Sequence, residues 1–177
     1  LHVHRDNRTG AYSTEFRPHD QADYVTWTVP IAYSAGPRAK NPLFDKVLED
    51  IFFDDPDREG KMRSLKQCAG AMLLPAFPQI FFLWGKTGSR KSTLAKIFMR
   101  LLDPDNVASV EPYQMDGFLL ESMISKLVNV RTEIDPNRVI PDSFLKSVED
   151  RVPILVNRKN KLAVRALLPG VHVFCTN

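Results

Sequence analysis

A glycine-bearing loop near the middle of the chain has residue types that bind phosphate. Residues 80–98 read IFFLWGKTGSRKSTLAKIF, an apolar run followed by a polar loop and a helix-like pattern. In the motif G-x-x-x-x-G-K-[ST], backbone N–H groups and the lysine hold phosphates, and the hydroxyl meets Mg²⁺. The stretch therefore predicts a nucleotide-binding loop made of Gly85, Lys86, Thr87, Gly88, Ser89, Arg90, Lys91, Ser92 and Thr93.

Two lysines in this loop are followed by a hydroxyl residue, so the motif has two possible registers. Lys86 would need a glycine at position 80, but that position is Ile80, inside the apolar run. Lys91 fits, because Gly85 precedes it at the motif's spacing and Ser92 follows it. Arg90 departs from the motif, since a glycine there normally allows unusual backbone angles or close approach to a ligand. A strand-to-helix turn without nucleotide remains the alternative.

Polar residues that follow two later apolar runs could complete such a site. Phosphoryl transfer needs an acid beside the metal and a group that positions the attacking nucleophile. Open α/β sheets bind their ligands at the carboxyl ends of their strands. Glu133 follows one apolar run and is the candidate acid, whereas Asp135 is expected to be an ordinary acid of the turn before Pro136. Asn177 follows the last run, where an amide could sense the γ-phosphate or orient water.

The elements that must position these residues alternate between strand and helix. A continuous apolar run such as IFFLW is typical of a strand buried on both faces of a parallel sheet. The order predicts an α/β fold with a mainly parallel core. His172, inside the last strand, is expected to be packed rather than catalytic. The expected strands are 80–84, 106–110, 127–134 and 171–176, and the expected helices are 92–102, 118–124 and 142–148.

The residues before this core predict two further segments. Asn41 and Pro42 form a cap and first turn for one helix, and a second helix follows until Pro75. Earlier stretches, including YVTWTVPIAY at 24–33, are rich in β-branched and aromatic residues. We expect a β-rich lead-in over 1–38, a helical hairpin over 39–76 and a nucleotide-binding core over 77–177 that is incomplete at its C-terminus.

Composition limits the classes of protein to which the chain could belong. With 177 residues, 44% of them hydrophobic, the chain is within the range of a globular domain. Its longest apolar stretch contains Pro75 and Pro78 and is too short for a membrane span of about 20 residues. Cys68 and Cys175 lie in apolar surroundings, which is typical of buried free thiols and favours a reducing cytoplasm. The net charge of +3 permits a nucleic-acid partner.

Basic residues gather near the C-terminal end, and they suggest where nucleic acid could bind. The sequence NRKNK at 157–161 is a possible hairpin between the acidic and amide candidates. A basic groove is what single-strand binding needs. A merely solvated hairpin is the alternative. The cluster consists of Arg151, Arg158, Lys159, Lys161 and Arg165.

Four of these motifs occur in an order that resembles a known family. GKTGSRKST, LVNVRTEID, LKSVED with RKNK, and VHVFCTN resemble the Walker A, Walker B, B-prime and C motifs of superfamily 3 helicases. The resemblance is to the helicase part of phage and plasmid primase-helicases, relatives of the poxvirus-type enzymes. The stretch upstream of the loop is similar to their lead-in. The resemblance implies a P-loop, AAA+-like core, ATP and Mg²⁺ as cofactors, single-stranded DNA as partner and a hexameric ring.

The resemblance also implies a role for individual residues. Lys91 and Ser92 would bind the β/γ-phosphates and Mg²⁺, Glu133 would hold the metal and polarise water, and Asn177 would be the polar residue of motif C. Lys146 and Asp150 match the B-prime motif. Lys146 and the basic stretch of this motif, Arg158, Lys159 and Lys161, would bind DNA. Besides Arg90, Glu149 departs from the pattern, because relatives often have glycine before the acid.

We therefore expect an ATP-dependent DNA helicase module that moves on single-stranded DNA. It would work in the cytoplasm of a bacterial or archaeal host, without a membrane, and could be encoded by a phage or plasmid. The chain is expected to be truncated after the motif C strand, before the arginine finger, and to have low activity alone. The alternatives are a non-hydrolysing assembly module, in which Arg90 has removed turnover, and a P-loop phosphotransferase, for which no acceptor-binding lid is visible.

Overall fold

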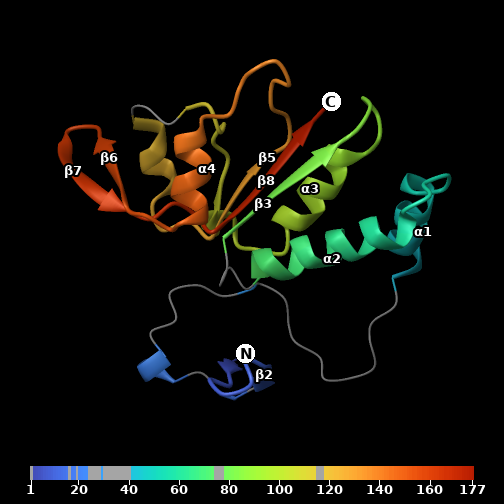
Figure 1. Ribbon diagram of the computed structural model, residues 1–177, viewed down its shortest axis with the longest axis horizontal. Helices are drawn as coiled ribbons and strands as arrows, with labels where there is room; N and C mark the ends of the chain where they lie inside the picture. The colour runs from blue at the N-terminus through green and yellow to red at the C-terminus, as the bar shows by residue number, and fades with distance from the viewer. Residues whose placement is uncertain are drawn as a thin grey trace.

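The chain folds into a layered α/β structure from residue 79 onward (Figure 1). The computed structural model describes residues 2–15, 17–18, 20–23, 29, 41–73, 78–114 and 118–177. Strands and helices alternate there, which confirms the predicted α/β class. The elements are β3 (Gln79–Trp84), α3 (Lys91–Met99), η2 (Pro104–Asn106), β4 (Val107–Ala108), η3 (Phe118–Met123), β5 (Val128–Arg131), α4 (Asp142–Glu149), β6 (Ile154–Arg158), β7 (Lys161–Ala166) and β8 (Val171–Thr176).

Four strands form one parallel sheet in the order β3-β8-β5-β4. The last strand of the chain, β8, is thus inserted between β3 and β5. Trp84 pairs with Thr176, and Arg131 pairs with Phe174. The carboxyl ends of β3, β8 and β5 therefore finish beside one another, although they are far apart in sequence.

Strand β8 is buried along almost its whole length, because it lies between two other strands and under both covering layers. Residues 171–175 are all buried. Because side chains alternate along a strand, Val171, Val173 and Cys175 join one hydrophobic cluster. Phe174 joins a second cluster, and His172 packs beside it. The sheet is therefore covered on both faces, as expected for parallel strands.

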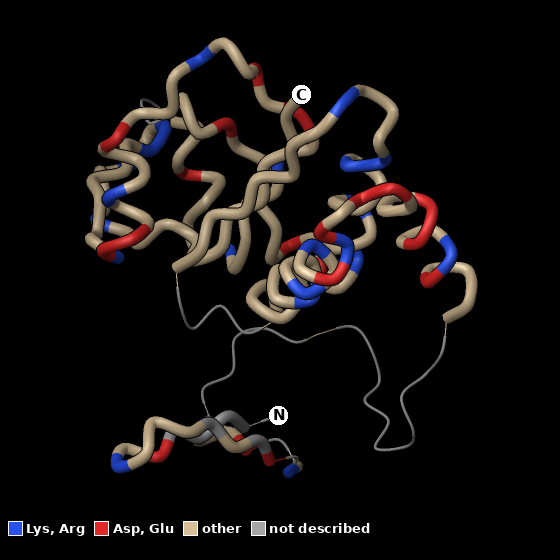
Figure 2. The backbone as a smooth tube through the Cα atoms, turned by 45° about the vertical axis from the view of Figure 1, so that its right-hand side comes forward, with Lys and Arg blue, Asp and Glu red and all other residues tan. Residues whose placement is uncertain are grey.

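Helices α1 (Pro42–Ile51), α2 (Arg58–Leu73) and α3 cover the first face (Figure 1). Asn41 starts α1, because its side chain accepts a hydrogen bond from the N–H of Phe44 at 3.1 Å and Pro42 follows it. Leu48, Met72 and Phe98 are among the side chains buried against the sheet. Figure 2 shows basic and acidic positions interspersed along α1 and α2, so no charge of one sign dominates this layer.

Helix α4, η3 and the antiparallel hairpin β6–β7 cover the second face. Phe144 of α4 is fully buried and lies against Phe174, with ring centroids 6.1 Å apart. Val156 of β6 and Met123 of η3 belong to the same cluster. The hairpin is thus anchored to the core by one face and exposed on the other.

A buried polar pair, Asn129 and His172, ties β5 and β8 to the segment that follows β4. The amide of Asn129 bonds both backbone groups of Val110, at 2.8 and 2.9 Å, and its Nδ2 lies 3.2 Å from His172 Nδ1. The Nε2 of His172 lies 2.9 Å from the carbonyl of Pro169, and burial lowers the pKa of His172 to about 4. The ring is therefore neutral and fully partnered, which confirms that His172 is a packed residue.

Several elements differ in extent or type from their prediction, and the helix expected at 92–102 ends at Met99. The strand expected at 106–110 spans only Val107–Ala108, because the Asn129 amide occupies the backbone groups of Val110. The strand expected at 127–134 ends at Arg131, although the N–H of Ile134 still donates to Cys175 at 2.9 Å. The helix expected at 118–124 is a short 3₁₀ helix.

The first residues form a separate antiparallel hairpin of β1 (His2–Arg5) and β2 (Tyr12–Glu15). Its turn is stabilised by Asp6, whose carboxylate accepts from the N–H of Arg8 at 2.7 Å. A 3₁₀ turn, η1 (Gln21–Asp23), follows. The strand predicted at 24–33 lies outside the described residues except for Val29.

Among the helices that the structure describes, none combines the length and apolar character needed to cross a membrane.

Candidate functional site

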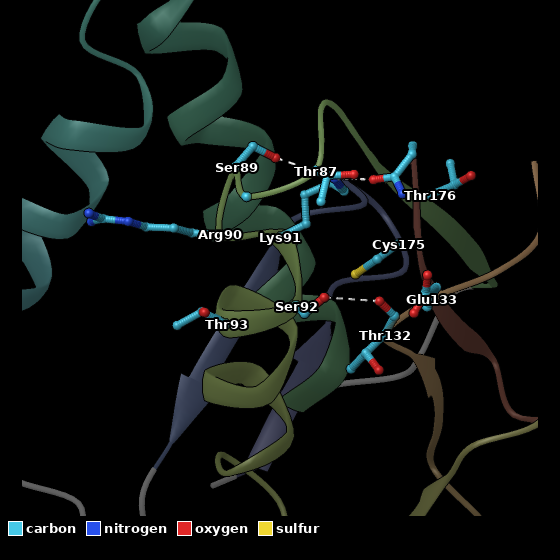
Figure 3. Close-up of a pocket in the computed structure, with 12 residues that line it drawn as sticks. Thr87, Ser89, Arg90, Lys91, Ser92, Thr93, Thr132, Glu133, Cys175 and Thr176 are labelled. Carbon is cyan, nitrogen blue, oxygen red and sulfur yellow. Dashed lines mark hydrogen bonds between the residues drawn. The ribbon is translucent and has the colours of Figure 1, made fainter.

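The loop between β3 and α3 lines a pocket of about 330 Å³ at the carboxyl ends of β3, β5 and β8 (Figure 3). The N–H of Gly85 donates to the carbonyl of Thr176 at 3.3 Å, which fixes the start of the loop to the end of β8. The pocket is lined by Thr87, Gly88, Ser89, Arg90, Lys91, Ser92, Thr93, Thr132, Glu133, Cys175, Thr176 and Asn177. Residues 87–93, Glu133 and Asn177, chosen from sequence, therefore lie around one cavity.

The ammonium group of Lys91 lies at the centre of these contacts. It donates to the side-chain oxygen of Asn177 at 2.9 Å, although the two residues are 86 positions apart in the chain. It also donates to the carbonyls of Gly85 and Lys86 and to the hydroxyl of Ser89. Lys86 enters this network through its backbone carbonyl, whereas its own side chain is exposed and does not line the pocket. The structure thus places Lys91, not Lys86, inside the pocket.

The hydroxyl of Ser92 and the carboxylate of Glu133 lie on facing elements. Ser92 Oγ donates to the carbonyl of Thr132 at 3.1 Å, and Thr132 directly precedes Glu133. The hydrogen bond from the N–H of Ile134 to the carbonyl of Cys175 holds the neighbouring Glu133 alongside the end of β8. A hydroxyl and an exposed carboxylate are oxygen ligands of the kind that Mg²⁺ prefers.

Arg90 adopts the left-handed backbone conformation that glycine normally supplies. Its φ is 64° and its ψ is 15°, at a cost of about 1–2 kcal/mol for a residue with a side chain. Figure 3 shows its side chain pointing away from the other lining residues, and its guanidinium lies 3.5 Å from Asp50 of α1. The side chain therefore leaves the pocket open. The side chain of Arg90, at the N-cap of α3, makes no capping hydrogen bond, so it leaves the N–H groups of the first turn available to an anion.

Sequence reasoning missed three residues of the pocket, Thr132, Cys175 and Thr176. Thr132 directly precedes Glu133, and Cys175 and Thr176 directly precede Asn177. Their position next to predicted site residues is the sequence feature that could have identified them. The hydroxyl of Thr176 is buried and has no hydrogen-bond partner in the described part of the chain. Burial raises the pKa of Cys175 to about 11, although Lys91 nearby lowers it in part. Cys175 is therefore a protonated thiol and not a nucleophile at neutral pH.

A second cavity of about 470 Å³ lies beside the first, between β3 and the helices α1 and α2. It shares Ser89 and Lys91 with the pocket described above. Apolar and aromatic side chains, including Phe52, Leu65 and Trp84, line it. Such a surface suits a flat ring attached to a phosphate group in the first pocket.

Asp135, the other acid near the end of β5, is used by its own turn. Its carboxylate accepts hydrogen bonds from the backbone and side-chain nitrogens of Asn137, at 2.9 and 3.2 Å. Its carbonyl accepts from the hydroxyl of Tyr113. This agrees with the interpretation of Asp135 as a turn residue.

The predicted DNA-binding residues fall on two elements. Arg158, Lys159 and Lys161 surround the turn of the hairpin β6–β7, where Asn160 has a φ of 58°. Arg158 Nε donates to the carbonyl of Leu162 at 3.0 Å, which folds that side chain over the turn. Lys159 and Lys161 are exposed. Lys146 lies apart from them, exposed in the last turn of α4.

Comparison with known families and curated proteins gives one match. A family described as "Family of unknown function (DUF5906)" matches residues 83–177, which include the loop, Glu133, the basic hairpin and Asn177. No curated protein matches the chain.

Solved structures of the NrS-1 C-terminal region share the fold at low sequence identity. An apo structure of the NrS-1 C-terminal region, in its A form, aligns with a TM-score of 0.60 and 14% identity, over 80% of this chain and 34% of that one. Another apo structure of the region has a TM-score of 0.56 and 13% identity, over 78% and 37%. JCV helicase with a bound compound has a TM-score of 0.49 and 17% identity, over 80% and 42%, which does not establish a common fold. The chain spans about a third of the NrS-1 structures.

Proposed function

The chain belongs to the DUF5906 family, since the match covers more than half of it, and we propose that it is an ATP-dependent DNA helicase module. It would couple ATP hydrolysis to movement on single-stranded DNA in the replication of a phage or plasmid. The NrS-1 similarity supports the fold that such a module requires.

The observation that carries the proposal is the contact between Lys91 and Asn177. A loop lysine and a strand-end amide, 86 positions apart, meet at 2.9 Å in a pocket that also contains Ser92 and Glu133. A structural turn has no need of this combination. A phosphate site does, because it requires a cation, a metal ligand, an acid and a polar group around one position.

Each residue of the pocket has a proposed role that follows from the chemistry of its side chain. Bound ATP with Mg²⁺ would supply the phosphoanhydride bond and the charge of the metal. Lys91 and backbone N–H groups of the loop would hold phosphate oxygens, and Ser92 and Glu133 would hold the metal. Glu133 would also accept a proton from the attacking water. The side-chain amide of Asn177 contacts the ammonium group of Lys91 directly. When a phosphate bound to that ammonium group leaves, the hydrogen-bond partners of the Asn177 amide would therefore change.

The hairpin β6–β7 supplies the proposed contact with DNA. Lys159 and Lys161 are exposed at its turn, and the backbone N–H of Lys159 lies 3.4 Å from a carboxylate oxygen of Glu121 in η3. That contact helps to fix the turn relative to the core. We propose that these lysines and Arg158 hold the phosphates of a single strand, with Lys146 as an outlying contact. The active form would be a hexameric ring.

Lys91→Ala tests the nucleotide site. We expect it to weaken binding of ATP with Mg²⁺ by about ten- to a hundredfold, because hydrogen bonds to charged groups contribute about 1.5–3 kcal/mol. Isothermal titration calorimetry measures the affinity. Lys86→Ala is the matched control, since it removes the same charge from the same loop but from a side chain outside the site. Equal reductions of affinity in both variants would contradict the assignment of Lys91.

A second candidate function, a nucleotide-binding assembly module without turnover, is favoured only by Arg90 at the loop position. If Arg90 blocked hydrolysis, Arg90→Gly would restore it. We expect instead that Arg90→Gly leaves the rate of phosphate release nearly unchanged, because the side chain already lies toward Asp50. The relief of about 1–2 kcal/mol of backbone strain is largely offset by the conformational entropy of glycine. A large gain in single-turnover phosphate release would support the assembly module.

No contact in the described residues favours the phosphotransferase alternative over the helicase proposal.

A further inference from the structure

A third cavity lies at the opposite end of the sheet from the nucleotide pocket. Its volume is about 530 Å³, and it is lined by residues 124–127, which lead into β5, and 167–170, which lead into β8. It therefore lies at the amino ends of the same two strands whose carboxyl ends face the nucleotide pocket. The six residues of β8 separate the two sites by about 20 Å.

The cavity has an unbalanced positive charge. Three cations line it, Lys126, Arg151 and Arg165, and none of its described lining residues is acidic. Lys126 donates to the backbone carbonyl of Asp105. Among the described residues, neither Arg151 nor Arg165 has an ion pair or a side-chain hydrogen bond. Two exposed guanidinium groups therefore remain free to bind an anion.

The backbone at Arg151 is unusual for a residue that only ends a helix. Arg151 follows α4 with a φ of 50°, the position at which helices commonly carry glycine. A side chain there costs about 1–2 kcal/mol. Ser125, which also lines the cavity, has a left-handed φ of 62° as well. The other left-handed non-glycine residues in the described part of the chain are Arg90, in the nucleotide pocket, and Asn160, at the hairpin turn, where asparagine adopts this conformation readily.

Strand β7 connects this cavity to the basic turn of the hairpin. Because side chains alternate, Lys161, Ala163 and Arg165 lie on one face of β7, and all three are exposed. Lys161 is at the turn and Arg165 lines the cavity, about 13 Å further along the strand. Figure 1 shows β7 leading from the hairpin turn toward the end of the sheet where β8 begins. The exposed face of β7 thus carries one cation at the hairpin turn and one at the cavity.

We propose that the cavity binds backbone phosphates of the same DNA single strand that the hairpin turn holds. The identification of this ligand as DNA rests on the proposed function. The planar guanidinium groups of Arg151 and Arg165 match phosphate oxygens in pairs. The strand would follow the exposed face of β7 from Lys161 to this cavity. The protein would then hold DNA at the sheet end remote from ATP.

The double variant Arg151→Gly with Arg165→Gln tests the inference. Glycine suits the left-handed position, so the fold is expected to keep its thermal stability while two cations are removed. Fluorescence anisotropy with a labelled oligothymidylate, repeated over a series of salt concentrations, measures the phosphate contacts. We expect the slope of log K against log salt to become shallower by about 1.4, because each phosphate of a single strand that a cation neutralises contributes about 0.7. Affinity for ATP is expected not to change.

Two further variants make the result specific. Lys46→Gln with Lys66→Gln removes two exposed cations from α1 and α2, and its slope is expected to equal that of the parent protein. Lys159→Ala with Lys161→Ala should reduce the slope through the hairpin turn. If only the hairpin variant changes the slope, the cavity inference is overturned and the proposed function stands. A chain that binds no ATP would contradict the proposed function, whatever the slopes show.

Discussion

Glu133→Gln is expected to lower ATP turnover by about 10²- to 10⁴-fold, the usual contribution of a positioned general base, while ATP affinity changes little. Glutamine keeps the size and one oxygen ligand of Glu133 but cannot accept the proton of the attacking water. Lys91 and the loop N–H groups, which are proposed to hold the phosphates, remain in place. Loss of turnover with retained binding is therefore the specific signature of this role.

The measurement is single-turnover phosphate release from ATP in the presence of Mg²⁺, made on the full-length protein together with an ATP titration. Glu149→Gln is the matched control, because it makes the same change on the exposed surface of α4, and Glu149 does not line the nucleotide pocket. We expect normal turnover in that control. Undiminished turnover in Glu133→Gln would remove Glu133 from the catalytic machinery.

The free energy of unfolding is expected to fall by about 3 kcal/mol between pH 6.5 and pH 4 because of the titration of His172 alone. Burial lowers the pKa of His172 from 6.5 to about 4 in the folded protein. Below pH 6.5 the unfolded chain binds a proton that the folded chain does not bind until about pH 4, and each pKa unit corresponds to about 1.4 kcal/mol. The contribution of His172 is therefore present above pH 6.5 and is lost as pH falls toward 4.

The surroundings of His172 make this effect separable from other titrations. Its contacts are with Asn129, Phe144, Pro169 and Phe174, none of which is charged. His172→Gln is the comparison variant, because glutamine also offers one donor and one acceptor but does not titrate. Urea unfolding at several pH values should give curves that diverge below pH 6.5, with the parent protein losing stability faster. Parallel curves would show that His172 does not titrate as its burial requires.

Local sequence patterns were sufficient for most of the elements that carry the site. The apolar run before Gly85 and the apolar periodicity after Lys91 predicted β3 and α3, and both are present. Spacing alone selected Lys91 over Lys86, and the structure places the Lys91 ammonium in the pocket. These features were predictable because each depends on neighbours within a few residues.

The lengths of two strands, β4 and β5, were predicted less well, because they depend on residues that are distant in the sequence. β4 is short because a side chain from β5, Asn129, occupies the backbone of Val110. β5 ends at Arg131 because the chain then bonds to Cys175 at a single point and leaves the ladder. Neither partner is visible in the local pattern, because each lies about 20 or 40 residues away.

Residue types and spacing alone determined the α/β class, the candidate loop and the strand-end residues Glu133 and Asn177, since strand and helix periodicity and motif spacing are local properties. Folding determined that β8 enters the sheet between β3 and β5, and this insertion places Asn177 2.9 Å from Lys91. It also determined that Arg90 takes the glycine conformation with its side chain toward Asp50, and that Arg151 and Arg165 line one cavity. These are contacts between segments far apart in the chain, and their positions depend on how the layers pack.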